Sequence, residues 1–247
     1  PLVEIVTEPD LESADEARDF MKQLITVINY LEIFDINNGI IKADANISIR
    51  ESGYKRIEIK NITGFREIER ALLYEVKRQK EEAHKIEQET RSWDSEKGIT
   101  FSLRKKETEE DYGYIIDTDL VVTGIEDKWI KEIKKHMPEL AQDKVKKFVE
   151  KYKIKKEDAE IIAIEKHLAE MFEKVAEEIN PILAAKWLRR ELVRVLNYNK
   201  KELHEVEIDE KHMIDLLKLV EEKRITDNVA SKLLEKLIEK PFDVKGY

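Results

Sequence analysis

The most regular alternation of apolar and polar residues lies between residues 40 and 60. A period of two along residues 40–50 is typical of a strand with one buried and one exposed face. Its apolar positions are Ile41, Ala43, Ala45, Ile47 and Ile49, and its polar positions are Lys42, Asp44, Asn46, Ser48 and Arg50. After a turn at 51–53, Ile57 and Ile59 alternate with Glu58 and Lys60. The two runs predict a hairpin whose polar side chains share one face of a sheet, with Ile47 and Ile57 on the buried face.

The rest of the first half is predicted to contain further strands and helices. Ser13 and Glu16 form a capping-box pattern, which favours a helix start at this position. Apolar residues then recur at helical spacing, both here and after Gly64. The predicted elements are a buried strand at 2–7, a helix from about residue 13, a helix at 64–86, and a second hairpin formed by 88–94 and 99–104.

Nearly all of the sequence after residue 125 has helical periodicity. All seven glycines except Gly246 lie at or before Gly124, so turns are concentrated in the first half. Helices are predicted at about 157–179, 181–196, 209–223 and 226–239. The expected fold is therefore α+β: an antiparallel-sheet part at 1–125, an all-helical domain at 126–208, and a further helical module at 209–247.

Composition narrows the functional classes. The chain has no cysteine, which excludes disulfides and cysteine-based zinc sites and favours a reducing compartment such as the cytoplasm. No segment approaches the roughly 20 apolar residues of a membrane span, so no membrane partner is expected. The net charge of −9 disfavours a polyanion as a partner, so RNA binding would need local basic patches or another subunit. Because the sequence begins without methionine in a strand-like run, we expect its natural start to be missing.

Polar residues on the predicted sheet face form the candidate site. Asp44, Asn46, Glu58 and Lys60 lie on this face, and Glu4 points to one side of the first predicted strand. Mg²⁺ binds one or two carboxylates and leaves positions for phosphate oxygens, and a lysine can neutralise a transferring phosphoryl group. A solvated strand face is the alternative, and alternation alone usually indicates it. Asp and Asn are depleted in strands, which favours a functional reason for Asp44 and Asn46.

The order of motifs in the first 120 residues resembles that of one protein family. The motifs are PLVEIVTEPD, DEARDF, KADANISIR, RIEIKNITGF, ERALLYEVKRQ, QETRSWD and GITFSLR. In this order they resemble the GatB family, the activating subunits of the aspartyl/glutamyl-tRNA(Asn/Gln) amidotransferases. The segments KFVEKYKIKKEDAEII and RITDNVASKLLEKLIEK resemble the helical domain and the start of the tail domain of that family. The resemblance implies a cradle-like sheet domain followed by helical domains.

A function is also implied by this resemblance. The family's protein is an ATP-dependent carbon–nitrogen ligase that uses ATP and Mg²⁺ to activate the side-chain carboxylate of Glu-tRNA(Gln) or Asp-tRNA(Asn). Ammonia from an amidase partner subunit then displaces the phosphate, and a small third subunit is a further candidate partner. By resemblance, Glu4 is the candidate metal ligand, and Asp44, Asn46, Glu58 and Lys60 are the candidate catalytic residues. Asn46 and Lys60 are also the candidate ATP-binding residues.

Departures from the family pattern leave alternatives open. The family's N-terminal segment, with its Glu-x-His strand, is not seen here, and the tail domain stops early. A family loop, DYRYFPEPDL, is replaced by DYGYIIDTDL at Asp111–Leu120. An inactive fragment that only binds tRNA or a partner, a plain helical scaffold, and the related archaeal paralogue GatE are the alternatives. GatE carries a large inserted domain, for which the sequence before residue 125 has no room, and this favours GatB.

Overall fold

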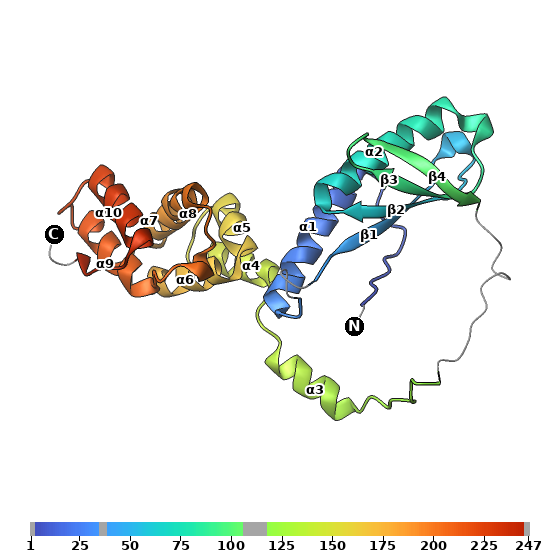
Figure 1. Ribbon diagram of the computed structural model, residues 1–247. Helices are drawn as coiled ribbons and strands as arrows, with labels where there is room; N and C mark the ends of the chain where they lie inside the picture. The colour runs from blue at the N-terminus through green and yellow to red at the C-terminus, as the bar shows by residue number, and fades with distance from the viewer. Residues whose placement is uncertain (1–2, 35–38, 106–117, 245–247) are drawn as a thin grey trace. The chain divides into compact units, whose positions relative to one another are not determined.

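The structure, a computed structural model, describes residues 3–34, 39–105 and 118–244 (Figure 1). Most of the segment Asp111–Leu120 therefore lies outside the described residues. The chain divides into two compact units: unit 1 contains Pro1–Ile25 and Ile33–Lys135, and unit 2 contains Thr26–Glu32 and His136–Tyr247. The predicted boundary at residue 125 precedes this division, because most of helix α3 (Asp127–His136) groups with unit 1.

Unit 1 is built on a four-stranded sheet. In spatial order its strands are β1 (Lys42–Ile47), β2 (Ile57–Thr63), β3 (Glu89–Asp94) and β4 (Ile99–Lys105). The α+β class is confirmed, and β1–β2 and β3–β4 are the two predicted antiparallel hairpins. β2 and β3 are parallel, so the expectation of an antiparallel sheet is wrong at this junction. The reason is helix α2 (Phe65–Glu81), a crossover that returns the chain to the starting end of β2.

One face of the sheet is packed against helices, and the other is partly exposed. Helices α1 (Ala14–Leu31) and α2 pack against fully buried isoleucines of β2, of which Ile57 and Ile59 are two. The exposed fractions of Phe101 and Leu103 on β4 are 45% and 49%, and Phe101 lies opposite Ser92 on the face that carries Lys60. Short 3₁₀ turns, η1 (Arg50–Ser52) and η2 (Ala83–Lys85), follow β1 and α2.

The N-terminal predictions have mixed outcomes. The Ser13 hydroxyl accepts a hydrogen bond from the N–H of Glu16 at 3.2 Å, as predicted, whereas the Glu16 carboxylate accepts from the N–H of Glu12 at 2.7 Å instead of from Ser13. The strand predicted at 2–7 is wrong for its described residues, which form no strand and leave Val3 exposed. A strand needs a neighbour to satisfy its backbone N–H and C=O groups, and the described part of the chain provides none here.

A buried polar cluster, here called the Glu75 cluster, lies between α2 and the strands β3 and β4. The fully buried Glu75 carboxylate accepts hydrogen bonds from Arg78 Nη2 at 2.6 Å and from Thr100 Oγ1 at 2.9 Å. Thr100 Oγ1 accepts from Arg91 Nε at 2.8 Å, and Arg91 Nη1 donates to Glu89 Oε1 at 2.6 Å. The cluster keeps its charges paired, which is the condition for burying them.

Unit 2 is helical wherever the structure describes it, and no strand follows residue 130 in the described chain, as predicted. Its helices are α4 (Ala141–Glu150), α5 (Lys156–Ile164), α6 (Lys166–Glu178), α7 (Pro181–Lys186), α8 (Val193–Asn199), α9 (Glu210–Glu221) and α10 (Asp227–Glu239). A π-helical turn, η4 (Trp187–Leu192), joins α7 to α8, and a 3₁₀ turn, η5 (Leu203–Glu205), precedes α9. One core extends from Phe148 to Val244, so the residues after 209 pack with the preceding helices. Of the helices described, none combines the length and apolar character needed to cross a bilayer.

The single helix predicted at 157–179 is two helices, α5 and α6. Glu165 between them has extended backbone angles, φ −107° and ψ 120°. Its carboxylate accepts hydrogen bonds from the N–H groups of His167 and Leu168. These are the free donors at the start of α6, so Glu165 acts as an N-cap that the apolar periodicity did not reveal.

Glu173 on α6 should make the stability of unit 2 sensitive to acid. Burial raises the pKa of this carboxyl, but hydrogen bonds from Lys144 and Lys147 outweigh burial and hold the pKa below its usual value. A depressed folded-state pKa stabilises the fold above the unfolded-state value, roughly pH 4.3, and this stabilisation is lost as pH falls through the folded-state value. We expect Glu173→Gln to lower the free energy of unfolding at pH 7 by about 2 kcal/mol. The variant should also lose less of its stability than the wild-type protein when the pH falls. Urea unfolding of the wild-type and variant proteins, from pH 7 down through the folded-state pKa of Glu173, measures both effects. If the two proteins lose stability in parallel as the pH falls, the prediction is wrong.

Candidate functional site

The candidate site is the polar face of the β1–β2 hairpin. Asn46 lies directly opposite Glu58 in the register. Lys60 Nζ lies 2.8 Å from Asp44 Oδ2 and 3.1 Å from Glu58 Oε1, so one ammonium group bridges two carboxylates from neighbouring strands. Ile57, one residue before Glu58, is fully buried on the opposite face. The predicted gathering of these polar side chains on one sheet face is therefore confirmed.

A β-bulge aligns Lys60 with Asp44. Ala43 pairs with Ile62 and Ala45 pairs with Ile59, so Asp44 lies opposite two residues, Lys60 and Asn61. Asn61 has a left-handed backbone conformation with φ 64°, which asparagine adopts more readily than most residues. The extra residue lets Lys60 stay on the face of Glu58 while it reaches Asp44 on the neighbouring strand.

Strand β3 adds two hydroxyl groups that the residue patterns did not assign to the candidate site. Thr90 Oγ1 donates a hydrogen bond to Glu58 Oε2 at 3.1 Å, and Asn61 Nδ2 donates to Ser92 Oγ at 2.8 Å. Both hydroxyl residues are buried, with exposed fractions of 1% for Thr90 and 3% for Ser92. The alternation within 89–94 was the available signal, but assigning its faces requires the parallel pairing of β2 with β3.

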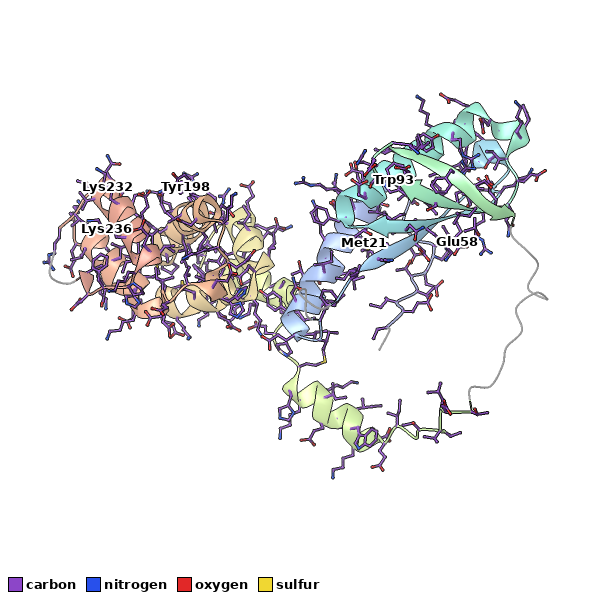
Figure 2. The ribbon with its side chains drawn as sticks, viewed as in Figure 1. Met21, Glu58, Trp93, Tyr198, Lys232 and Lys236 are labelled. Carbon is purple, nitrogen blue, oxygen red and sulfur yellow. The ribbon has the colours of Figure 1, made fainter. Side chains whose placement is uncertain are left out.

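The two carboxylates of the site differ in how exposed their side chains are. The side chain of Glu58 is 17% exposed, whereas that of Asp44 is 47% exposed. The hydrogen bond to Asp44 raises the pKa of Lys60 above its usual value, with Glu58 adding to the increase and partial burial opposing it. Lys60 is therefore a permanent cation beside two carboxylates. Figure 2 labels Glu58, which belongs to the polar face of the sheet. It also labels Trp93, which lies on the face covered by helices and donates a hydrogen bond to Glu67 of α2.

A metal ion could be held here only in part by protein groups. Among the described residues, no three acidic or histidine side chains lie together as a complete metal cluster. Glu4 is exposed on a segment without strand pairing, so its predicted position on a strand is not found. Asp44 and Glu58 still fit Mg²⁺ in the nucleotide-bound manner, in which one or two carboxylates act with phosphate oxygens and water. Lys60 is placed to attract the same phosphate groups.

Comparison with known proteins places this site within a known domain. The family model of the GatB/GatE catalytic domain matches residues 1–131, which include all five candidate residues. A second model, described as a GatB domain, matches residues 170–245. The chain belongs to the GatB family.

Relatives of this GatB-family chain come from bacteria and archaea. It is 41% identical over 255 aligned residues to a Clostridium beijerinckii protein, covering 98% of the chain and 53% of that protein. It is 40% identical to a protein of Methanocaldococcus jannaschii and 42% identical to one of Methanothermobacter thermautotrophicus, covering 96% and 100% of the chain, and 52% and 54% of those proteins. All three are named as the same subunit of an aspartyl/glutamyl-tRNA(Asn/Gln) amidotransferase. The chain spans about half the length of these curated relatives.

Proposed function

We propose that the chain takes part in ATP-dependent activation of the side-chain carboxylate of Glu-tRNA(Gln) or Asp-tRNA(Asn). The observation that carries this proposal is the Lys60 ammonium bridging Asp44 and Glu58 on the sheet of a domain that matches the GatB/GatE catalytic domain. The names of the relatives supply the substrate class.

The proposed chemistry converts a poor acyl donor into a good one. An oxygen of the substrate carboxylate attacks the γ-phosphorus of ATP, the bond from this phosphorus to the bridging oxygen breaks, and ADP leaves. Ammonia then attacks the carbonyl carbon, inorganic phosphate leaves, and the nitrogen loses a proton to give the amide. Negative charge develops on the phosphoryl oxygens during the first step, so the protein must provide cations that were in place beforehand.

The candidate residues have distinct proposed roles. Lys60 neutralises the transferring phosphoryl group, and Asn46 binds the nucleotide. Asp44 and Glu58 orient the Lys60 ammonium and offer carboxylate oxygens to Mg²⁺, with Glu4 as a further ligand. When bound, Mg²⁺ would neutralise phosphate oxygens and act as a Lewis acid.

The test is nucleotide consumption in the complete amidotransferase. The enzyme carrying this sequence is given ATP with Glu-tRNA(Gln), Asp-tRNA(Asn) or correctly charged Gln-tRNA(Gln), and ADP and amidated product are measured. We expect ADP release to rise with a misacylated tRNA and not with the correctly charged one. ADP release that is the same with all three tRNAs would contradict the proposal and favour a role in binding alone.

We also propose that the amidase subunit covers helix α3. No residue of this helix is buried, and its apolar side chains are exposed: Trp129 is 51% exposed and Ile133 is 65% exposed. One chain of a multi-chain enzyme is expected to leave such a patch for its partner. The small third subunit and misacylated tRNA complete the proposed assembly.

Replacing Ile133 with glutamate should weaken binding of the amidase subunit about tenfold or more, because a charge would enter an apolar interface. Lys131→Glu introduces the same side chain on the polar side of α3 and is the matched control. Sedimentation of mixed subunits measures both affinities. Equal affinities for the two variants would place the amidase contact elsewhere.

A further inference from the structure

Strand β3 separates two polar regions of unit 1. Its residues Glu89 and Arg91 face α2 and belong to the Glu75 cluster. Thr90 and Ser92 face the other way and bond side chains of β2. The two hydroxyls are buried in the middle of the sheet, yet each is directed at the candidate site.

Glu58 is held from two sides. Lys60 Nζ binds its Oε1 at 3.1 Å, and Thr90 Oγ1 donates to its Oε2 at 3.1 Å. A glutamate side chain has three rotatable bonds, and fixing both oxygens selects one orientation of the carboxylate. Thr90 is suited to this because its β-branched side chain is stiff and almost completely buried.

The pairing geometry makes Thr90 a fixed reference for this carboxylate. Glu58 and Thr90 are partners in the parallel β2–β3 register, and Lys60 and Ser92 are the next partners on the same face. Ser92 accepts from Asn61, the left-handed residue of the bulge that aligns Lys60 with Asp44. One strand thus supports both Glu58 and the bulge.

From this geometry we infer that Thr90 is a positioning residue: it orients the Glu58 carboxylate for the proposed activation of the tRNA-bound substrate without touching substrate itself. The inference rests on the proposed function. It predicts that the hydroxyl matters only while Glu58 is present. A residue that merely fills the sheet would contribute independently of Glu58.

The experiment is a double-mutant cycle in the complete amidotransferase. Thr90→Val keeps a β-branched shape suited to a strand and removes the hydroxyl, Thr90→Ser keeps the hydroxyl, and Glu58→Ala removes the group to be positioned. We expect Thr90→Val to lower the kcat of ATP-dependent amidation about tenfold with little change in the KM for misacylated tRNA. Thr90→Ser should restore most of this loss, and Thr90→Val should have no further effect in the Glu58→Ala enzyme.

Several outcomes would overturn the inference. If Thr90→Val amidates normally while Glu58→Ala is impaired, Thr90 is not a positioning residue, and the proposed function still stands. Losses that multiply in the double variant would show that Thr90 acts independently of Glu58. Normal amidation by Glu58→Ala would instead count against the proposed site. If Thr90→Val does not fold, Thr90→Ala against Thr90→Ser gives the same comparison, since both are small and differ in the hydroxyl; equal rates for these two would also reject the inference.

Discussion

Replacing Glu58 with glutamine in the complete amidotransferase should lower the rate of ATP-dependent amidation about 10²-fold or more, by analogy with other lost electrostatic contacts. The change keeps the size and reach of the side chain but removes the charge that pairs with Lys60 at 3.1 Å. Binding of misacylated tRNA should change little, because contacts to its phosphates elsewhere dominate that affinity. The measurements are amidated product per turnover and a filter-binding curve for tRNA at fixed salt.

Glu81→Gln is the matched control, since Glu81 is an exposed carboxylate on α2 that pairs only loosely with Lys77, at 3.9 Å. Glutaminase activity of the partner subunit, measured without tRNA, should survive in both variants. Normal amidation by Glu58→Gln would exclude this residue from the site. Loss of tRNA binding together with amidation would assign Glu58 a structural role.

Replacing Glu75 with alanine should destabilise unit 1 by about 3–5 kcal/mol, the cost of removing one partner from a buried ion pair. The change leaves the guanidinium of Arg78 and the Thr100–Arg91 chain without their buried carboxylate. Glu75→Gln should destabilise less, because an amide can still accept from Thr100. Glu81→Ala on the exposed side of the same helix should change stability by less than about 0.5 kcal/mol.

Hydrogen exchange in rising urea can measure this loss within the intact chain. Peptides from residues 57–105 report on unit 1, and peptides from 168–199 report on unit 2 as an internal control. We expect Glu75→Ala to shift the loss of protection in the first set to lower urea and to leave the second set unchanged. Unchanged protection in both sets would show that the Glu75 cluster contributes little net stability.

The part of the site that could be predicted from sequence is the part formed by neighbouring strands of one hairpin. Alternation fixes which residues share a face, so Asp44, Glu58 and Lys60 could be grouped from the sequence alone. The bulge at Asn61 could not be predicted, because it is a local change of register that leaves the alternation on either side intact. The prediction of a strand at 2–7 was wrong for a related reason: an apolar pattern indicates a strand only where a neighbouring strand can pair with it.

Contacts across the β2–β3 junction were beyond the sequence patterns. Thr90 lies 32 residues from Glu58 in the sequence, and no periodicity relates the faces of strands separated by a crossover helix.

Glu75 lies in a helix rich in charged residues, where a carboxylate normally faces water. Its complete burial and its contacts with Thr100, 25 residues away, and with Arg91 show that this carboxylate is enclosed.

The parallel junction between β2 and β3 also has a kinetic consequence. Each hairpin closes a short loop, so β1–β2 and β3–β4 can form early, within microseconds. Joining them requires closing the longer segment that contains α2, and contacts of this range form late because their loop-closure entropy must be overcome first. The Thr90–Glu58 hydrogen bond spans this junction. A newly made chain should therefore pair Lys60 with Asp44 well before Glu58 accepts its hydrogen bond from Thr90. A variant that slows the docking of the two hairpins should acquire activity later than it acquires strand structure.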